Sequence, residues 1–167
     1  MPGTFLIRDY VSGDWDVIAH VHDRARLDEL WLTVGVDAFR PLAEIAHDEG
    51  LFDGTLCVAV LDGVVSGFIA TDAGEIAWLY TDPDLYRRGI ARRLLRHAIA
   101  LWEGEMRVSV LVGNDPALAL YRSEGFEIVE TRDGNLQCFD DFPARGHILR
   151  RGPARNTAQP STVDKSR

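Results

Sequence analysis

The chain has 167 residues, of which 46% are hydrophobic and 26% charged, the length and composition of one compact globular domain. Its net charge is −8, and residues 1–62 carry twelve acidic groups against four arginines, which argues against a nucleic-acid partner and fits a cationic amine substrate, although the same acids can serve only solubility. No apolar run reaches the roughly 18 residues of a membrane span, and the N-terminus lacks the pattern of a signal peptide, so we expect a cytoplasmic protein without a membrane partner.

The first 50 residues predict one strand followed by two helices. Residues 5–11 alternate in polarity as a strand does, and Asp14 is a suitable N-cap for a helix over residues 15–30. A second helix is expected over residues 37–49, where Pro41 is tolerable only in the first turn.

The middle of the chain predicts the core of a sheet. Residues 55–61 and 64–71 are apolar runs joined through Asp62 and Gly63, a strong hairpin signal. Residues 75–80 continue the sheet after a short turn. Because the sequence contains no G-x-G-x-x-G or G-x-x-x-x-G-K-[ST] motif, a nucleotide-binding domain is a weaker alternative.

The stretch over residues 79–102 passes from a strand end into a helix that is rich in arginine. Positive charge at a helix N-terminus is unfavourable unless an anion binds there, and Gly89 leaves the first-turn amides uncovered for a phosphate. An ordinary solvated basic face is the alternative interpretation. Helical spacing predicts one buried face, formed by Ile90, Ala91, Leu94, Leu95, Ala98, Ile99 and Trp102.

The rest of the chain alternates strands with one helix and ends in a polar tail. Residues 152–167 lack apolar periodicity, so we expect a disordered tail after a domain over residues 1–151. The elements expected before the tail are a strand over 107–112, a helix over 115–124 that stops at Gly125, and strands over 126–131 and about 146–150.

The two cysteines predict neither a disulfide framework nor a metal site. Cys57 lies in an apolar run, where a small core residue is expected, and Cys138 has no neighbouring histidine. We therefore expect no metal and no covalent cysteine mechanism.

Two segments carry recognisable motifs. Thr81, Asp82 and Pro83 form the end of a predicted strand, and residues 86–91 read Tyr-Arg-Arg-Gly-Ile-Ala. They resemble motif A of the GNAT superfamily of acyl-CoA-dependent N-acyltransferases, with Tyr86 in place of the usual Gln or Arg. The pattern N-x-x-A-x-x-x-Y-x-x-x-G-F of motif B is matched by Asn114, Ala117, Tyr121, Gly125 and Phe126.

Both motifs occur in the family's order, and the resemblance covers roughly residues 5–150. It implies an α/β fold with a mixed, mostly antiparallel sheet of about six to seven strands, about four flanking helices, and splayed strands at the cofactor site. The implied activity is acetyl transfer from acetyl-CoA to a primary amine by direct attack in a ternary complex. A non-catalytic CoA-binding regulatory module with the same fold is the alternative.

The resemblance assigns two catalytic residues. Tyr121 matches the motif B tyrosine beside the thioester sulfur, where a phenol can donate a proton to the departing thiolate. Glu75 matches the general-base glutamate of histone-acetylating members, and the strand period predicts it on one face with Leu79 and Thr81. Asp72 or a water relay is the alternative base.

The resemblance also implies how acetyl-CoA is held. The pantetheine arm inserts between two splayed strands, here 75–81 and 107–112, and contacts the backbone of Leu79, Tyr80 and Thr81. Asn114 is expected to contact the arm, to cap the following helix, or both. The residues expected at the pyrophosphate are Arg87, Arg88, Gly89, Ile90, Ala91 and Arg92.

The acceptor remains open between a small-molecule amine, a protein N-terminus and a lysine side chain. In the family the first helical region forms one wall of the acceptor site, so Asp28, Glu29 and Trp31 are candidate contacts or simply exposed helix surface. A homodimer is compatible with this interpretation.

Overall fold

The computed structural model describes residues 3–137, 139 and 141–153 and contains one open sheet of seven strands. The strands are β1 (Phe5–Asp9), β2 (Thr55–Leu61), β3 (Val64–Asp72), β4 (Glu75–Thr81), β5 (Met106–Leu111), β6 (Glu127–Asn135) and β7 (Pro143–Arg151). The helices are α1 (Trp15–Leu32), α2 (Leu42–Ile45), α3 (Ile90–Leu101) and α4 (Asp115–Ser123). Residues 154–167 of the tail that is expected over 152–167, like Cys138, lie outside the described residues.

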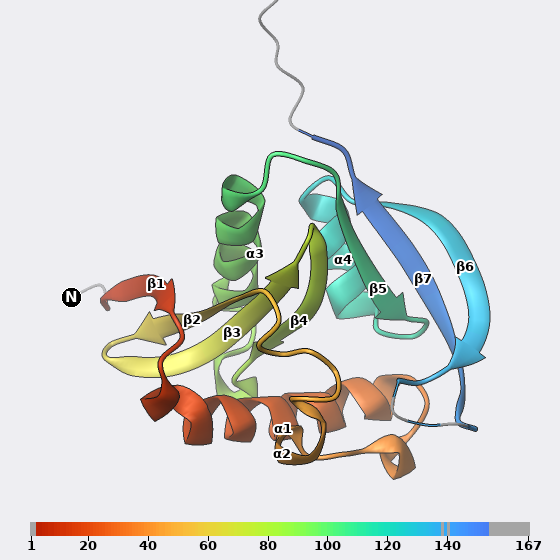
Figure 1. Ribbon diagram of the computed structural model, residues 1–167, viewed down its shortest axis with the longest axis horizontal. Coiled ribbons are helices and arrows are strands. Elements are labelled where there is room, and N and C mark those ends of the chain that lie inside the picture. Colours follow the sequence, from red (N-terminus) through yellow and green to blue (C-terminus); the bar gives the residue numbers. More distant parts are fainter. Residues whose placement is uncertain (1–2, 138, 140, 154–167) are drawn as a thin grey trace, which may run out of the picture.

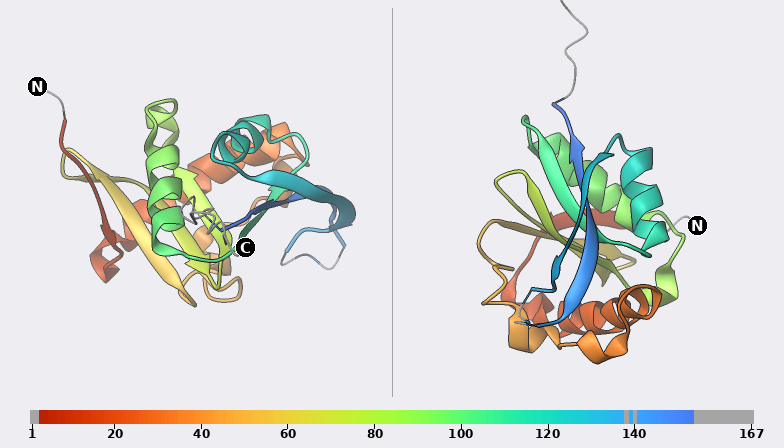
Figure 2. Two further views of the ribbon diagram at one scale, coloured as in Figure 1. Left: turned by 90° about the horizontal axis from the view of Figure 1, so that it is seen from above. Right: turned by 90° about the vertical axis from the view of Figure 1, so that its right-hand side faces the viewer.

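The strand order is β1-β2-β3-β4-β5-β7-β6, and every neighbouring pair is antiparallel except β4 and β5 (Figure 1). Helices α3 and α4 cover one face of this sheet, while α1 and α2 pack on the other (Figure 2). The mixed, mostly antiparallel sheet with four flanking helices that the sequence predicts is therefore confirmed. Among the described residues, no helix has the length and apolar character needed to cross a membrane.

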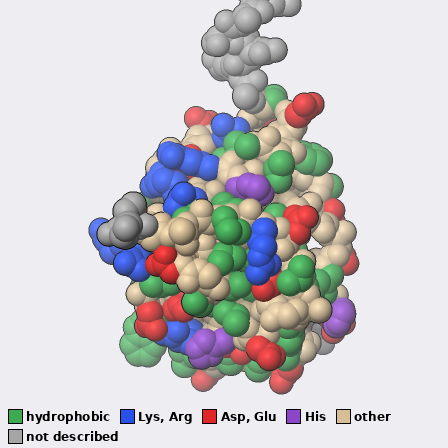
Figure 3. All heavy atoms as spheres, turned by 90° about the vertical axis from the view of Figure 1, so that its left-hand side faces the viewer, with side chains coloured by type: hydrophobic (Ala, Val, Ile, Leu, Met, Phe, Trp, Pro, Cys, Tyr) green, Lys and Arg blue, Asp and Glu red, His purple; other side chains and the backbone are tan. Residues whose placement is uncertain are grey.

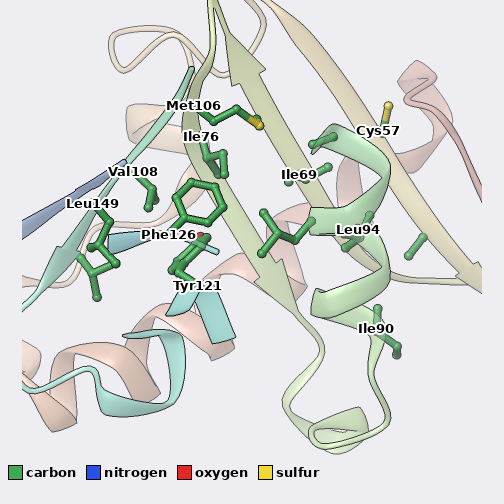
Figure 4. Close-up of a cluster of buried hydrophobic side chains, with 14 residues drawn as sticks. Cys57, Ile69, Ile76, Ile90, Leu94, Met106, Val108, Tyr121, Phe126 and Leu149 are labelled. Carbon is green, nitrogen blue, oxygen red and sulfur yellow. The ribbon is translucent and has the colours of Figure 1, made fainter. Parts of the chain in front are cut away.

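The two largest of three hydrophobic clusters among the described residues pack helices against the two faces of the sheet. The cluster under α3 contains Ile90, Leu94, Leu95, Ala98 and Ile99 of the predicted apolar face but not the half-buried Ala91, and it extends to Tyr121 and Phe126 (Figure 4). Trp102 departs from the prediction, since it follows the last helical residue and stays 42% exposed. The second cluster packs α1 and α2 against β2, β3 and β4.

Asp14 precedes α1 as predicted, but its carboxylate does not cap this helix. Arg8 donates to both of its oxygens, at 2.7 and 2.9 Å, and the Val11 amide donates to one of them at 3.0 Å. The hydrogen bonds from Arg8 lower the pKa of Asp14, and the amide adds to that effect. Asp14 therefore ties β1 to the start of α1.

This ion pair predicts a pH dependence of stability. Because the folded-state pKa of Asp14 lies below its unfolded value of about 3.9, the stabilisation is complete above that value and is lost as pH falls through the folded pKa. Asp14→Asn should therefore unfold at a lower temperature than the wild type at pH 7, and the gap should narrow towards pH 3. Thermal unfolding followed by circular dichroism measures this. An equal gap at both pH values would show that the ionised carboxylate is not responsible.

The second predicted helix is shorter than expected. Residues 37–49 form a 3₁₀ turn over Val36–Ala38, an extended segment, and the single turn of α2. Phe39 and Pro41 both have extended backbone between these two turns, and a proline disfavours helical geometry in the residue before it. The prediction of a continuous helix is wrong for this reason.

The last two strands are longer than predicted. The ladder between β6 and β7 runs from the pair of Glu127 and Arg150 to the pair of Asn135 and Pro143. Almost every residue of β6 is nevertheless exposed. Backbone pairing with β7 therefore extends this edge strand beyond the predicted residue 131, where no apolar alternation marks a strand in the sequence.

Candidate active site

The sheet is split between β4 and β5. These parallel strands pair only at Glu75 with Arg107 and at Ile76 with Val108, and then diverge (Figure 1). Beyond Ile76, the edge of β4 that faces β5 has no ladder partner, so its backbone N–H and C=O groups are available to an inserted ligand. The splayed strands that the sequence predicts are confirmed, and they include the backbone of Leu79.

A β-bulge changes the face on which Glu75 lies. On β3, the neighbouring residues Ala70 and Thr71 pair with Trp78 and Ile76 of β4. Ala77, between these two, is therefore an extra residue without a partner on β3. Accordingly, Ile76 packs in the cluster under α3 and Trp78 in the cluster under α1. The prediction that Glu75 shares a face with Leu79 is therefore wrong. Glu75 shares the α1 face with Trp78, towards the predicted acceptor wall.

The start of α3 offers free backbone amides. Gly89 is the N-cap with a φ of 79°, and Arg87 also has a left-handed φ, of 64°. The amide of Arg93 donates to the Gly89 carbonyl at 3.1 Å, which leaves the amides of Ile90, Ala91 and Arg92 without helical partners. Successive free amides in such a turn form an anion-binding concavity.

The arginines of this region divide into two groups. Arg92 donates to Ser123 and Glu124 at 2.8 and 2.5 Å, Arg96 also pairs with Glu124, and Arg93 lies over the ring of Phe5. Within the described part of the chain, Arg87 and Arg88 make no ion pair. They are therefore the guanidinium groups most available to a bound anion. Seen from the β1 side, basic and acidic side chains are interspersed (Figure 3).

Tyr121 lies next to the split in the sheet. The Asn114 side chain accepts a hydrogen bond from the Ala117 amide at 3.3 Å, so the predicted cap of α4 is present. Two turns later, Tyr121 is 5% exposed and packs edge-on against Phe126 (Figure 4). Burial, and then the charge of Glu29, raise the pKa of Tyr121 above that of an ordinary phenol, so the hydroxyl stays protonated at neutral pH.

A cleft of about 540 Å³ connects the split to the face covered by α1. Five of the predicted site residues line it, while Thr81 and the six residues predicted at the pyrophosphate lie outside its lining. Of the three predicted acceptor contacts on α1, only Glu29 lines the cleft, and Trp31 is 78% exposed. The five lining residues are Glu75, Leu79, Tyr80, Asn114 and Tyr121.

His22 and Arg26 were not identified as candidate site residues from the sequence, although both line the cleft. His22 is buried, with Nδ1 2.9 Å from Asp23 Oδ1, and burial lowers its pKa despite the opposing effect of Asp23. Arg26 lies one turn further along α1 and pairs with Glu29. Helical spacing from Ile18 places both on the buried side of α1, which is the signal that could have found them. Among the described residues, no group of three or more His, Cys, Asp or Glu side chains could hold a metal ion.

A sheet split at one parallel pair, a buried phenol beside the split and a helix start with free backbone amides agree with the acyl-CoA-dependent acyltransferase that the sequence resembles. Residues 52–128 match the family described as "Acetyltransferase (GNAT) domain". The chain is 35% identical over 112 residues to the N-alpha-acetyltransferase RimI of Mycobacterium tuberculosis, covering 62% of this chain and 71% of that relative. The chain belongs to the GNAT family of N-acetyltransferases.

Other similarities agree with this assignment. The chain is 28% identical over 127 residues to the uncharacterized N-acetyltransferase YafP of Escherichia coli, covering 74% of this chain and 82% of the relative. The ribosomal-protein-S18-alanine N-acetyltransferase of Escherichia coli has the same fold, with a TM-score of 0.63, 19% identity, and coverage of 96% and 99% of the two chains. The yncA protein of Salmonella typhimurium, solved with its cofactor acetyl-CoA, has a TM-score of 0.65 at 17% identity, covering 94% and 98%.

Proposed function

We propose that the protein transfers an acetyl group from acetyl-CoA to a primary amine by direct attack in a ternary complex. The observation that carries this proposal is the split between β4 and β5 with the buried Tyr121 hydroxyl group beside it. The names of the similar RimI and S18-alanine enzymes favour the α-amine of a peptide as the first acceptor to test.

The unpaired groups of the chain fit the cofactor. The free edge of β4 can hydrogen-bond the pantetheine arm, and the free amides at the start of α3 can bind its pyrophosphate, with Arg87 and Arg88 beside them. Thr81 Oγ1 is buried without a partner among the described residues, at the end of β4. Acetyl-CoA supplies the activated acyl group as a thioester.

The protein then has two protons to manage. A lysine-like amine with a pKa near 10.4 is mostly protonated at pH 7, and its deprotonation costs roughly 4 to 5 kcal/mol, whereas a peptide α-amine with a pKa of about 7.7 to 8.0 costs roughly 1 kcal/mol. Glu75, on the α1 face of β4, is the proposed base, either directly or through water, and Asp72 is the alternative. When the amine nitrogen bonds to the acyl carbon and the C–S bond breaks, Tyr121 donates its proton to the thiolate.

An assay of thiol release over an acceptor panel tests this function. The panel contains peptides with free N-termini, N-terminally blocked peptides with one lysine, and small primary amines. We expect acetyl-CoA-dependent turnover of at least one class, with a mass increase of one acetyl group on the amine. Binding of acetyl-CoA without turnover of any amine would instead support the non-catalytic module. Calorimetry with CoA, ATP and NAD checks that the binding site is selective for CoA.

A further inference from the structure

One carboxylate in the lining of the cleft, that of Glu29, is held by side chains from three parts of the fold. Glu29 Oε1 accepts hydrogen bonds from Arg26 on α1 and from the Tyr80 hydroxyl on β4, the latter at 3.3 Å. Glu29 Oε2 accepts from Asn114 Nδ2, before α4, at 3.1 Å. The carboxylate therefore joins α1 to both sides of the split in the sheet.

This carboxylate retains capacity for another donor. A carboxylate has about four lone-pair sites, and the three contacts from Arg26, Tyr80 and Asn114 leave one of them open. The Glu29 side chain is 20% exposed and lines the cleft, so the open site is accessible from the cleft. Arg26 and Tyr80 both donate to Oε1 whereas only Asn114 donates to Oε2, so the open position lies on Oε2, where a cationic N–H donor can form a charge-assisted hydrogen bond.

The other carboxylates that line the cleft are less constrained. Within the described residues, the side chains of Glu49 and Glu75 have no hydrogen bond or ion pair, and Asp133 pairs only with Arg145 at 3.6 Å. A fixed carboxylate orients a ligand at a lower entropic cost than a free one. Glu29 is therefore the best-ordered anionic site for a substrate in this cleft.

Glu29 also lies near the proposed general acid. Its charge contributes to the raised pKa of Tyr121, and also of Tyr80 and Tyr86, so all three phenols lie within its electrostatic reach. α4 carries Tyr121, and Asn114 at the start of α4 holds Glu29, so one helix fixes both groups.

We propose that Glu29 binds the ammonium group of the acceptor beside Tyr121, and that Arg26, Tyr80 and Asn114 act as positioning residues for it. This inference rests on the proposed function and adds that the acceptor is recognised as a cation before it loses its proton. The predicted general base is a separate carboxylate.

Two unreactive probes test this recognition without turnover. N,N-dimethyl-Ala-Ala-Ala amide carries a cationic amine, whereas N-acetyl-Ala-Ala-Ala amide is neutral at the same position. We expect the CoA-loaded wild type to bind the cationic probe at least about tenfold more tightly in calorimetry. Glu29→Gln should abolish this preference without changing the affinity for CoA, and Glu29→Asp should retain part of it.

Asp16→Asn is the matched control, because it removes an exposed carboxylate from the same helix outside the cleft. It should keep the full preference for the cation. A preference that persists in Glu29→Gln would overturn the inference, as would a wild type that binds both probes equally or neither. Failure of the proposed function is a different result, namely absence of turnover across the amine panel.

Discussion

Tyr121→Phe is expected to lower kcat by about 10²- to 10⁴-fold while leaving the affinity for acetyl-CoA unchanged. The variant loses the hydroxyl that we propose protonates the departing thiolate, but it keeps the ring that packs against Phe126. Since burial raises the pKa of this phenol, the wild type holds the proton through neutral pH, and the loss should be seen across that whole range. Steady-state thiol release and calorimetry measure the two quantities.

Tyr86→Phe is a suitable control for this result. Burial and Asp28 also raise the pKa of Tyr86, but its side chain does not line the cleft. Its kcat should therefore stay close to that of the wild type. An unchanged kcat for Tyr121→Phe at every pH would remove Tyr121 from the role of general acid.

Gly89→Glu is expected to weaken acetyl-CoA binding by about 100-fold. With a φ of 79°, position 89 has a left-handed conformation that a residue with a Cβ adopts at a cost, and the new carboxylate would repel the pyrophosphate. No atom lies within 4 Å of the position of a Cβ at residue 89, so the change should spare the packing of the fold. Calorimetry with acetyl-CoA gives the dissociation constant.

Gly89→Gln separates the two causes, because it imposes the same backbone strain without the negative charge. It should show an intermediate loss of affinity. If Gly89→Glu bound acetyl-CoA as tightly as the wild type, the pyrophosphate could not lie at the start of α3.

Turns and helix ends were predictable where a residue type favours one backbone conformation. Asp62 and Gly63 form the predicted hairpin, and both have left-handed φ angles, of 51° and 80°. Gly125, with a φ of 91°, follows the end of α4, and Asn114 caps its start. At each of these positions the residue type itself favours the observed backbone geometry. The β2–β3 hairpin and the two ends of α4 could therefore be located from sequence.

Features that depend on tertiary pairing could not be predicted. The bulge at Ala77 is a shift in register between two strands, and no residue type marks it, so the face of Glu75 was assigned wrongly. The proposed role of Glu29 depends on its hydrogen bonds with Tyr80 and Asn114, which are 51 and 85 residues away in the chain. Sequence placed Glu29 among three acidic or aromatic candidates on α1, and only its partners in space separate it from the other two.

The most direct test of the proposed site is a crystal structure of the complex with acetyl-CoA. We expect the pyrophosphate oxygens within hydrogen-bonding distance of the backbone amides between Arg87 and Arg92. The pantetheine arm should lie between β4 and β5, with the sulfur next to the Tyr121 hydroxyl. A pyrophosphate bound elsewhere, or an arm that lies outside the split between these strands, would contradict the proposed site.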